Sequence, residues 1–293
     1  MGSCCGALCR ELDIRNLGLK FHEPRAFSES PALPLPLFIF YRAFLGSFFV
    51  AAYVYVVLEY QSYLIILHFA YWSLAFVALY FIFGCLTSIW QLLCGSSLVQ
   101  SSEGTSKTSG YHFLEHPLGD TSCALRPGER DDDKDLSRKL PRLNLLAWHH
   151  EVLWVLNSIA ADTSVVVLVA YFSFWFHGLH FTIAGYIDLV QHIAPFLVMF
   201  IDSFVHGFPV RLLHVIYANI FGAVYVVFTI IYILTEVPDL KGNPTTFPSL
   251  EFGNTPIIYT AWLAVYIGVG FLVAQLFFYL MYKIRCALIK SGE

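Results

Sequence analysis

Charged residues are scarce in this sequence. Asp, Glu, Lys and Arg make up 13% of its 293 residues, whereas 57% of the residues are hydrophobic. Soluble domains carry a charge on about a quarter of their residues. The charges also cluster at the start, in one central segment and at the end, which leaves long apolar stretches between them. A soluble core cannot hide so much apolar surface, so the composition predicts an integral membrane protein.

The sequence also lacks a basic surface, a signal peptide and a glycan acceptor. Its formal net charge is -4 at pH 7, and tracking phosphates needs clustered Lys and Arg, so we predict no nucleic-acid partner. Hydrophobicity begins only near Leu35, which argues for a first span that acts as an uncleaved anchor. Asn243 precedes a proline, and Asn254 is followed by Thr255 and Pro256. We therefore expect no N-linked glycan.

Signatures of metal, transport and channel sites are missing as well. His149, His150 and Glu151, like the pair His177 and His180, lack the spacing and the second ligand group of a zinc signature. The two halves of the chain show no clear repeat, and nothing resembles a selectivity filter or a ring of charges. We predict no metal and no cofactor.

Long apolar windows are what the sequence does contain, and six of them reach the roughly 20 residues that a helix needs to cross a bilayer. We predict an all-α, polytopic transmembrane bundle. The apolar run that starts at Leu143 is expected to be an interfacial helix or an inner extension of the third span. The predicted spans are Phe38–Leu58, Tyr63–Leu86, Ile159–Phe176, Phe181–Val205, Leu213–Thr235 and Ile257–Tyr282.

The basic residues predict the orientation of these spans. Every Lys and Arg of the 17 except Lys241 falls in segments that an even number of spans places on one side, and such residues are retained in the cytoplasm. Both termini are therefore expected in the cytoplasm, at the plasma membrane or an endomembrane. The predicted organisation is an amino-terminal segment (1–37), two spans (38–92), a disordered loop (93–142), an interfacial helix with four spans (143–284) and a tail (285–293).

The cysteines follow the same topology. None lies in a predicted external loop, so we expect no disulfide framework. Five lie where reversible palmitoylation occurs, next to the cytoplasmic face. These are Cys4, Cys5, Cys9, Cys94 and Cys286.

Ionisable groups at membrane depth are costly, and the fourth span holds the richest set. Asp188 and His192 are four residues apart, so both lie on one helix face and the carboxylate could orient the imidazole. Pro195 frees a backbone carbonyl beside them. A general base needs a nucleophile, and Ser73 on the second span lies at a similar depth, whereas Thr163 lies nearer the cytoplasm.

The alternative to catalysis is structural, because Ser, Thr and His also join membrane helices by hydrogen bonds. Asp202, near the inner end of the fourth span, is close in sequence to Arg211 and His214. A short pairing of Asp202 with Arg211 is most simply structural.

Five segments and three aromatic residues in this order and spacing resemble the rolling stone family of multi-span membrane proteins. The segments are Leu12–Leu19, His22–Phe27, Phe69–Ser73, Asp188–His192 and Pro209–His214, followed by Tyr217, Tyr225 and Phe228. The resemblance covers nearly the whole chain apart from the central loop. The fly member of the family is associated with myoblast fusion, so the resemblance implies a role in cell fusion or differentiation at the membrane.

The rolling stone family is distantly similar to the androgen-induced and androgen-dependent TFPI-regulating proteins. Those multi-span hydrolases cleave fatty acid esters of hydroxy fatty acids with an intramembrane Thr and His. The similarity implies that His192 matches their His, whereas their Thr falls on Ala70 in one register and on Ser73 in another. The first register implies a non-catalytic relative, which acts by interaction in the bilayer. The second implies a hydrolase in which Ser73 attacks a lipid ester, His192 takes its proton and Asp188 holds the imidazole.

Overall fold

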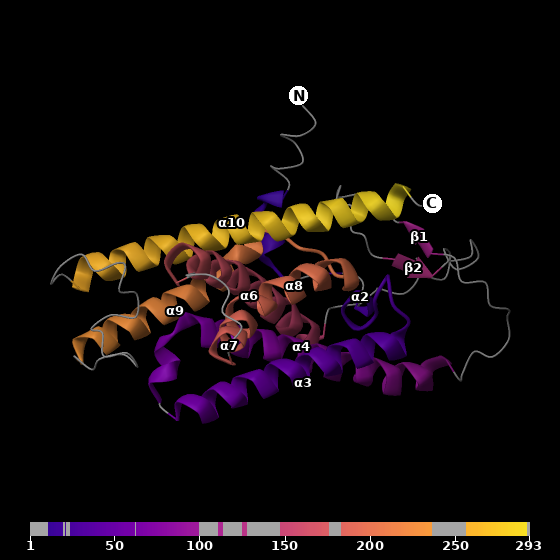
Figure 1. The fold of residues 1–293 in the computed structure, drawn as a ribbon. Coiled ribbons are helices and arrows are strands. Elements are labelled where there is room, and N and C mark those ends of the chain that lie inside the picture. The colour runs from indigo at the N-terminus through magenta and orange to yellow at the C-terminus, as the bar shows by residue number, and fades with distance from the viewer. Residues whose placement is uncertain are drawn as a thin grey trace.

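The computed structural model describes residues 11–19, 21, 24–61, 63–99, 111–113, 125–127, 147–175, 183–235 and 256–291. These residues form an elongated helical bundle (Figure 1), in which six helices are long and apolar enough to cross a membrane. The predicted all-α transmembrane bundle is confirmed. In the view of Figure 1, α10 and α3 form the two outer edges, and α4, α6 and α8 lie between them.

The amino-terminal part contains three short helices and two spans. Its helices are η1 (Ile14–Leu17), α2 (Arg25–Ser28), α3 (Leu35–Tyr60), η2 (Tyr63–Leu67) and α4 (Phe69–Val99). α3 starts after Pro34, with a proline in its first turn, where the missing N–H costs nothing. It ends at Tyr60, and the next residue, Gln61, caps it with a left-handed φ of 44°.

The carboxyl-terminal part contains the other four spans. Its elements are α6 (Trp148–Ala170), η3 (Tyr171–Trp175), α7 (Ile183–His192), α8 (Ala194–Val205), η4 (Leu212–His214), α9 (Val215–Leu234) and α10 (Pro256–Ser291). η3 is a π-helical turn that continues α6. α7 and α8 together make up the fourth span, which is broken at Ile193.

Two of the helices begin at residues other than those that the sequence predicts. α6 starts at Trp148, so the piece before Ile159 is an inner extension of the third span. Its polar start is accommodated because the amino-terminal segment covers it, with the Ser28 Oγ atom 3.5 Å from Nε2 of the buried His150. α4 begins at Phe69, after the 3-10 turn η2, and continues to Val99.

The segment between the second and third spans is described only in part. The sequence predicts no secondary structure there, but β1 (Tyr111–Phe113) and β2 (Leu125–Pro127) form a short antiparallel pair. The remainder of 100–146 lies outside the described residues, so its disorder stays a prediction.

α6 is the central helix of the bundle and contacts α4, α7, α8, α9 and α10. Small residues let neighbouring helices approach closely. A Cβ atom on Gly222 of α9 would lie 2.7 Å from both Ile267 and Phe271 of α10. α9 and α10 therefore pack closely at Gly222, and Ala218, one turn earlier on α9, is fully buried.

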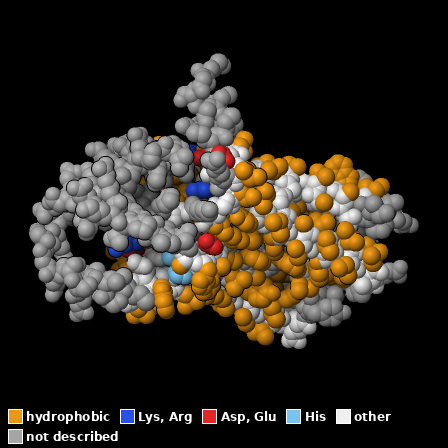
Figure 2. Space-filling view, turned by 180° about the vertical axis from the view of Figure 1, so that it is seen from behind, with side chains coloured by type: hydrophobic (Ala, Val, Ile, Leu, Met, Phe, Trp, Pro, Cys, Tyr) orange, Lys and Arg blue, Asp and Glu red, His pale blue; other side chains and the backbone are white. Residues whose placement is uncertain are grey.

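The surface is divided by polarity along the bundle. Figure 2 shows hydrophobic side chains over most of the described surface in view, with the visible charged and histidine side chains gathered toward one side of it. Exposed hydrophobic residues line α3, α9 and α10, including Phe44, Val227 and Leu272. Such an apolar surface suits contact with lipid chains.

Of the five cysteines predicted as palmitoylation sites, the structure describes the side chain of Cys286. Cys286 is 6% exposed inside the bundle, which leaves no room for an acyl chain on its sulfur. Cys286 is also disulfide-bonded, so the expectation of no disulfide is wrong there. Cys4, Cys5, Cys9 and the side chain of Cys94 lie outside the described residues, and their palmitoylation stays a prediction.

Candidate functional site

His192 lies at the break in the fourth span. It is the last residue of α7, and Pro195 occupies the first turn of α8. Proline cannot donate to the carbonyl one turn earlier and its ring crowds that carbonyl, which ends α7 at this point. The backbone carbonyl that the sequence predicts Pro195 to free therefore lies at a break between two helices.

The imidazole of His192 is held by the backbone. Its Nδ1 atom is 2.9 Å from the backbone carbonyl oxygen of Asp188, and its ring stacks on Tyr171 with centroids 4.6 Å apart. A carbonyl only accepts, so Nδ1 carries the proton and the Nε2 lone pair is unprotonated. The orienting group is therefore the Asp188 carbonyl, while the Asp188 residue as a whole is exposed.

Ser73 is fully buried between α4 and α6 and makes a different contact. Its hydroxyl donates to Thr163 Oγ1 at 3.0 Å, and Thr163 in turn donates to the carbonyl oxygens of Ile159 and Ala160. The two hydroxyls form a chain that ends on the backbone of α6. Ala70, the other candidate for the nucleophile position, is partly buried against the aromatic cluster around Phe221 and Tyr225.

The described structure brings Ser73 and Thr163 together and does not join them to His192 by a hydrogen bond. Asp188 and His192 do share one helix turn, as predicted. A hydrolytic relay needs a hydroxyl that donates to the imidazole. In this conformation each candidate hydroxyl donates elsewhere.

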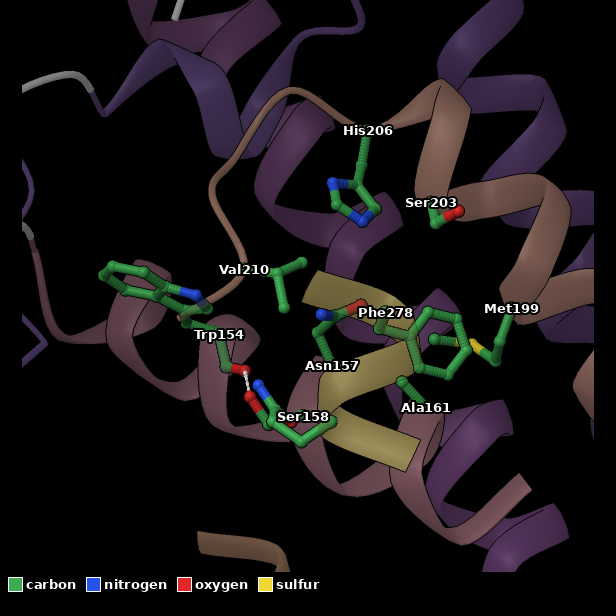
Figure 3. Close-up of a pocket in the computed structure, with 10 residues that line it drawn as sticks. Trp154, Asn157, Ser158, Ala161, Met199, Ser203, His206, Val210 and Phe278 are labelled. Atoms are coloured by element: carbon green, nitrogen blue, oxygen red, sulfur yellow. Dashed lines mark hydrogen bonds between the residues drawn. The ribbon is translucent and has the colours of Figure 1, made fainter. Parts of the chain in front are cut away.

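A small cavity lies between α6, α8 and α10, near the end of the bundle that carries the charged residues (Figure 3). Its walls mix apolar side chains with Asn157, Ser158, Ser203, His206 and Gln275. Both serines donate to carbonyl oxygens of their own helices, at 3.2 Å for Ser158 and 2.6 Å for Ser203. The cavity is polar enough to hold water.

His206 lines this cavity as a weak base. Burial, with the positive charges of Arg285 and Arg42 second and third, holds the pKa of His206 well below its ordinary value. An N–H of Arg285 lies 3.3 Å from His206 Nδ1. Because guanidinium only donates, Nδ1 accepts and the proton sits on Nε2. His206 is thus a neutral donor toward its surroundings.

A network around three buried charged residues, Asp202, Arg42 and Arg285, lies at this end of the bundle. Asp202 accepts hydrogen bonds from Tyr80 at 2.6 Å and Tyr41 at 3.2 Å. The predicted pairing of Asp202 with Arg211 is wrong, because the two tyrosines from α3 and α4 reach the carboxylate. Arg211 donates to Asn16 at 3.1 Å.

Two arginines tie the network to backbone carbonyls. Arg42, which is fully buried, donates to the carbonyl oxygens of Phe27 and Gly84 and to Ser88 Oγ. Arg285 donates to the carbonyl oxygens of Ser203, His206 and Phe208. Charge-assisted bonds of this kind are about twice as strong as neutral ones.

The amino-terminal segment is part of the same assembly. Phe27 is fully buried and stacks on Phe208, with centroids 4.9 Å apart. Trp154 of α6 donates to the carbonyl oxygen of Pro209 at 2.9 Å, and the Arg211 guanidinium lies 5.3 Å from its ring. Segments far apart in sequence therefore meet at one end of the bundle.

Sequence reasoning missed two residues here. Asp162 lies inside the third span and Arg42 inside α3, and both are fully buried. The signal for Asp162 is an acidic residue in an otherwise apolar window. Among the described residues no group of three or more His, Cys, Asp and Glu side chains could hold a metal.

The fold and this polar interior define a polytopic α-helical membrane protein with buried charged networks. Residues 146–291 match the family model described as protein rolling stone. Protein rolling stone of Drosophila melanogaster is 28% identical over 109 residues, which cover 36% of this chain and 38% of that protein. Through its carboxyl-terminal half the chain belongs to the rolling stone family. The alignment spans less than half the length of the fly relative, and no solved structure matches.

Proposed function

We propose that this chain is a membrane protein of the rolling stone type that acts by interaction at the plasma membrane during cell fusion or differentiation. The observation that carries the proposal is the family match over 146–291, which includes α6 through α10. The fusion role follows from the resemblance to the fly family member. Protein contacts at the membrane, rather than turnover of a substrate, are the activity we assign.

The proposed orientation has both termini in the cytoplasm. It is supported by the distribution of Lys and Arg along the sequence. The described basic side chains agree with it, because Arg42, Arg211 and Lys283 contact Phe27, Asn16 and Glu11 of the amino-terminal segment. These residues share one end of the bundle.

The rival function is an intramembrane lipid-ester hydrolase with Ser73 as nucleophile and His192 as base. The hydrogen bonds of the described residues favour the interaction proposal. Ser73 donates to Thr163 rather than to an imidazole, and the cavity near Ser158 is lined by neither Ser73 nor His192. His192 keeps an unprotonated Nε2 atom, so the two functions need a direct test.

A fusion-rescue assay distinguishes the interaction function from the hydrolase. Cultured myoblasts depleted of their own rolling stone protein receive the wild-type chain, Ser73→Ala, His192→Ala or Ser164→Ala at equal surface levels. Ser164 is a matched control, because it is buried on α6 and donates only to Ala161 of its own helix. We expect all four chains to restore fusion to within about twofold of one another, and a fluorophosphonate probe to leave Ser73 unlabelled.

Two results would contradict the proposal. Loss of rescue by both Ser73→Ala and His192→Ala, with Ser164→Ala active and Ser73 labelled by the probe, would establish the hydrolase. Failure of the wild-type chain to restore fusion would remove the fusion role itself.

A further inference from the structure

Asp162 is a fully buried carboxyl in the central helix of the bundle. Its residue is 0% exposed, and neither of its carboxyl oxygens has a hydrogen-bond partner among the described residues. α6 is packed on by five other helices, so this group is shielded from lipid and from bulk water. Hydrogen bonds to backbone carbonyls or hydroxyls, which explain buried residues such as Arg42 and Ser73, are not made by Asp162 to any described residue.

The charged groups around α6 are engaged elsewhere. α4 and α9 contribute no Asp, Glu, Lys, Arg or His within their bounds. On α7, His192 bonds to the carbonyl of Asp188, which is itself exposed. On α8, Asp202 is bound by Tyr41 and Tyr80. On α10, Lys283 pairs with Glu11, Arg285 bonds to three carbonyls, and Tyr266 donates to the carbonyl oxygen of Val166.

The remaining titratable side chains of α6 lie at its start. Glu151 precedes Asp162 by 11 residues, which is about 16 Å along a helix. The described surroundings therefore provide neither a cation nor a donor for an Asp162 carboxylate. An ionised carboxylate buried in this way is strongly disfavoured, whereas the neutral acid avoids most of that penalty.

Asp202 offers a contrast within the same molecule. It is equally buried, but two tyrosine hydroxyls donate to it and the charges of Arg42 and Arg285 act on it. These contacts offset part of the cost of burying a carboxylate, and Asp162 has no contact of this kind among the described residues. The two buried aspartates therefore differ in their partners rather than in their burial.

The cavity of Figure 3 lies within one helical turn of Asp162, because Ser158 and Ala161 line it. Ser158, one helical turn before Asp162 and on the same face, lines the cavity together with Asn157 and Ala161. The Asn157 Oδ1 atom is buried without a hydrogen-bond partner among the described residues. An ordered water in the cavity would satisfy it and bring an exchangeable proton to within one turn of Asp162.

We infer that Asp162 is a proton-binding site inside the membrane-spanning bundle, and that it exchanges its proton with water through the cavity lined by Asn157 and Ser158. Its ligand is a single proton, which makes the carboxyl neutral at physiological pH. The inference goes beyond the proposed function and does not depend on it.

Infrared spectroscopy measures the protonation state directly, because a protonated carboxyl has a C=O stretch separate from that of a carboxylate. The full chain in lipid vesicles is measured at about pH 7.5 in H₂O and in D₂O, with Asp162→Asn and the matched control Asp202→Asn. We expect a protonated-carboxyl band in the wild type that shifts in D₂O. It should be lost in Asp162→Asn and kept in Asp202→Asn.

The absence of the wild-type band, or its survival in Asp162→Asn, would overturn the site. A band that does not shift in D₂O after long exchange would overturn its access through the cavity. Should Asp162→Asn fail to fold, Asp162→Glu retains a carboxyl and must move the band. An unmoved band in that variant would also overturn the assignment.

Discussion

Asp202 is held by two tyrosines whose hydrogen bonds differ in length and surroundings. The Tyr80 bond is 2.6 Å long and buried, whereas the Tyr41 bond is 3.2 Å long and partly buried. A hydrogen bond to a charged group contributes about 1.5–3 kcal/mol when water cannot replace it. The shorter, drier bond should therefore contribute more to stability.

The pair of variants Tyr80→Phe and Tyr41→Phe tests this difference. We expect Tyr80→Phe to lower the free energy of unfolding by about 2 kcal/mol and Tyr41→Phe by about 1 kcal/mol. Each variant removes one hydroxyl and keeps the ring, so each is the other's control for packing. Reversible unfolding in mixed micelles gives both values. Equal losses, or none, would mean that Asp202 is not a carboxylate supported by Tyr80.

Some of these residue-level contacts could be predicted from the sequence and others could not. The sequence predicts a freed backbone carbonyl beside His192, because the effect of Pro195 on a helix is local. The partners of Asp202 could not be predicted, because Tyr41 and Tyr80 lie more than a hundred residues away from it in the chain. Asp188 supplies its carbonyl rather than its carboxylate, and that choice depends on side-chain direction, which spacing does not reveal.

At the scale of elements, irregular turns meet where spans three and four face one another. α6 ends in the π-helical turn Tyr171–Trp175, and α7 ends at His192, whose ring stacks on Tyr171. The sequence indicates the break but not the π-turn, because no proline marks it. π-turns are frequent at functional sites, which makes this junction a second region for mutagenesis.

The contact between α9 and α10 yields an element-level prediction. A Cβ atom on Gly222 would lie 2.7 Å from Ile267 and from Phe271, whereas one on Gly268 would meet only Asn219 Oδ1 at 3.6 Å. Gly222→Ala should therefore destabilise the protein by about 1–3 kcal/mol through overpacking. Gly268→Ala should be neutral or stabilise by up to about 1 kcal/mol, because alanine favours helix.

Thermal unfolding of the two glycine variants in detergent compares them under identical conditions. The wild type gives the reference midpoint. The account of close helix packing fails if Gly222→Ala melts at or above the midpoint of Gly268→Ala.

At the scale of the whole molecule, a long apolar bundle carries its buried charges near one end. Composition and the Lys and Arg count predict the six spans and their direction, because both depend on the bilayer rather than on tertiary contacts. Tertiary packing brings four residues together at one end of the bundle, namely Phe27, Arg42, Trp154 and Pro209. Neither the periodicity of the sequence nor its charge count predicts these contacts.

The central claim is a six-span bundle with its amino-terminal segment and charged end in the cytoplasm, and cysteine labelling in intact cells tests it most directly. Gln61, exposed at the end of α3, and Ile14, 79% exposed in the amino-terminal segment, are each replaced by cysteine. We expect a membrane-impermeant maleimide to label Gln61→Cys in intact cells, and to label Ile14→Cys and the unmodified chain only after permeabilisation. Labelling of Ile14→Cys in intact cells, or of Gln61→Cys only after permeabilisation, would contradict the account.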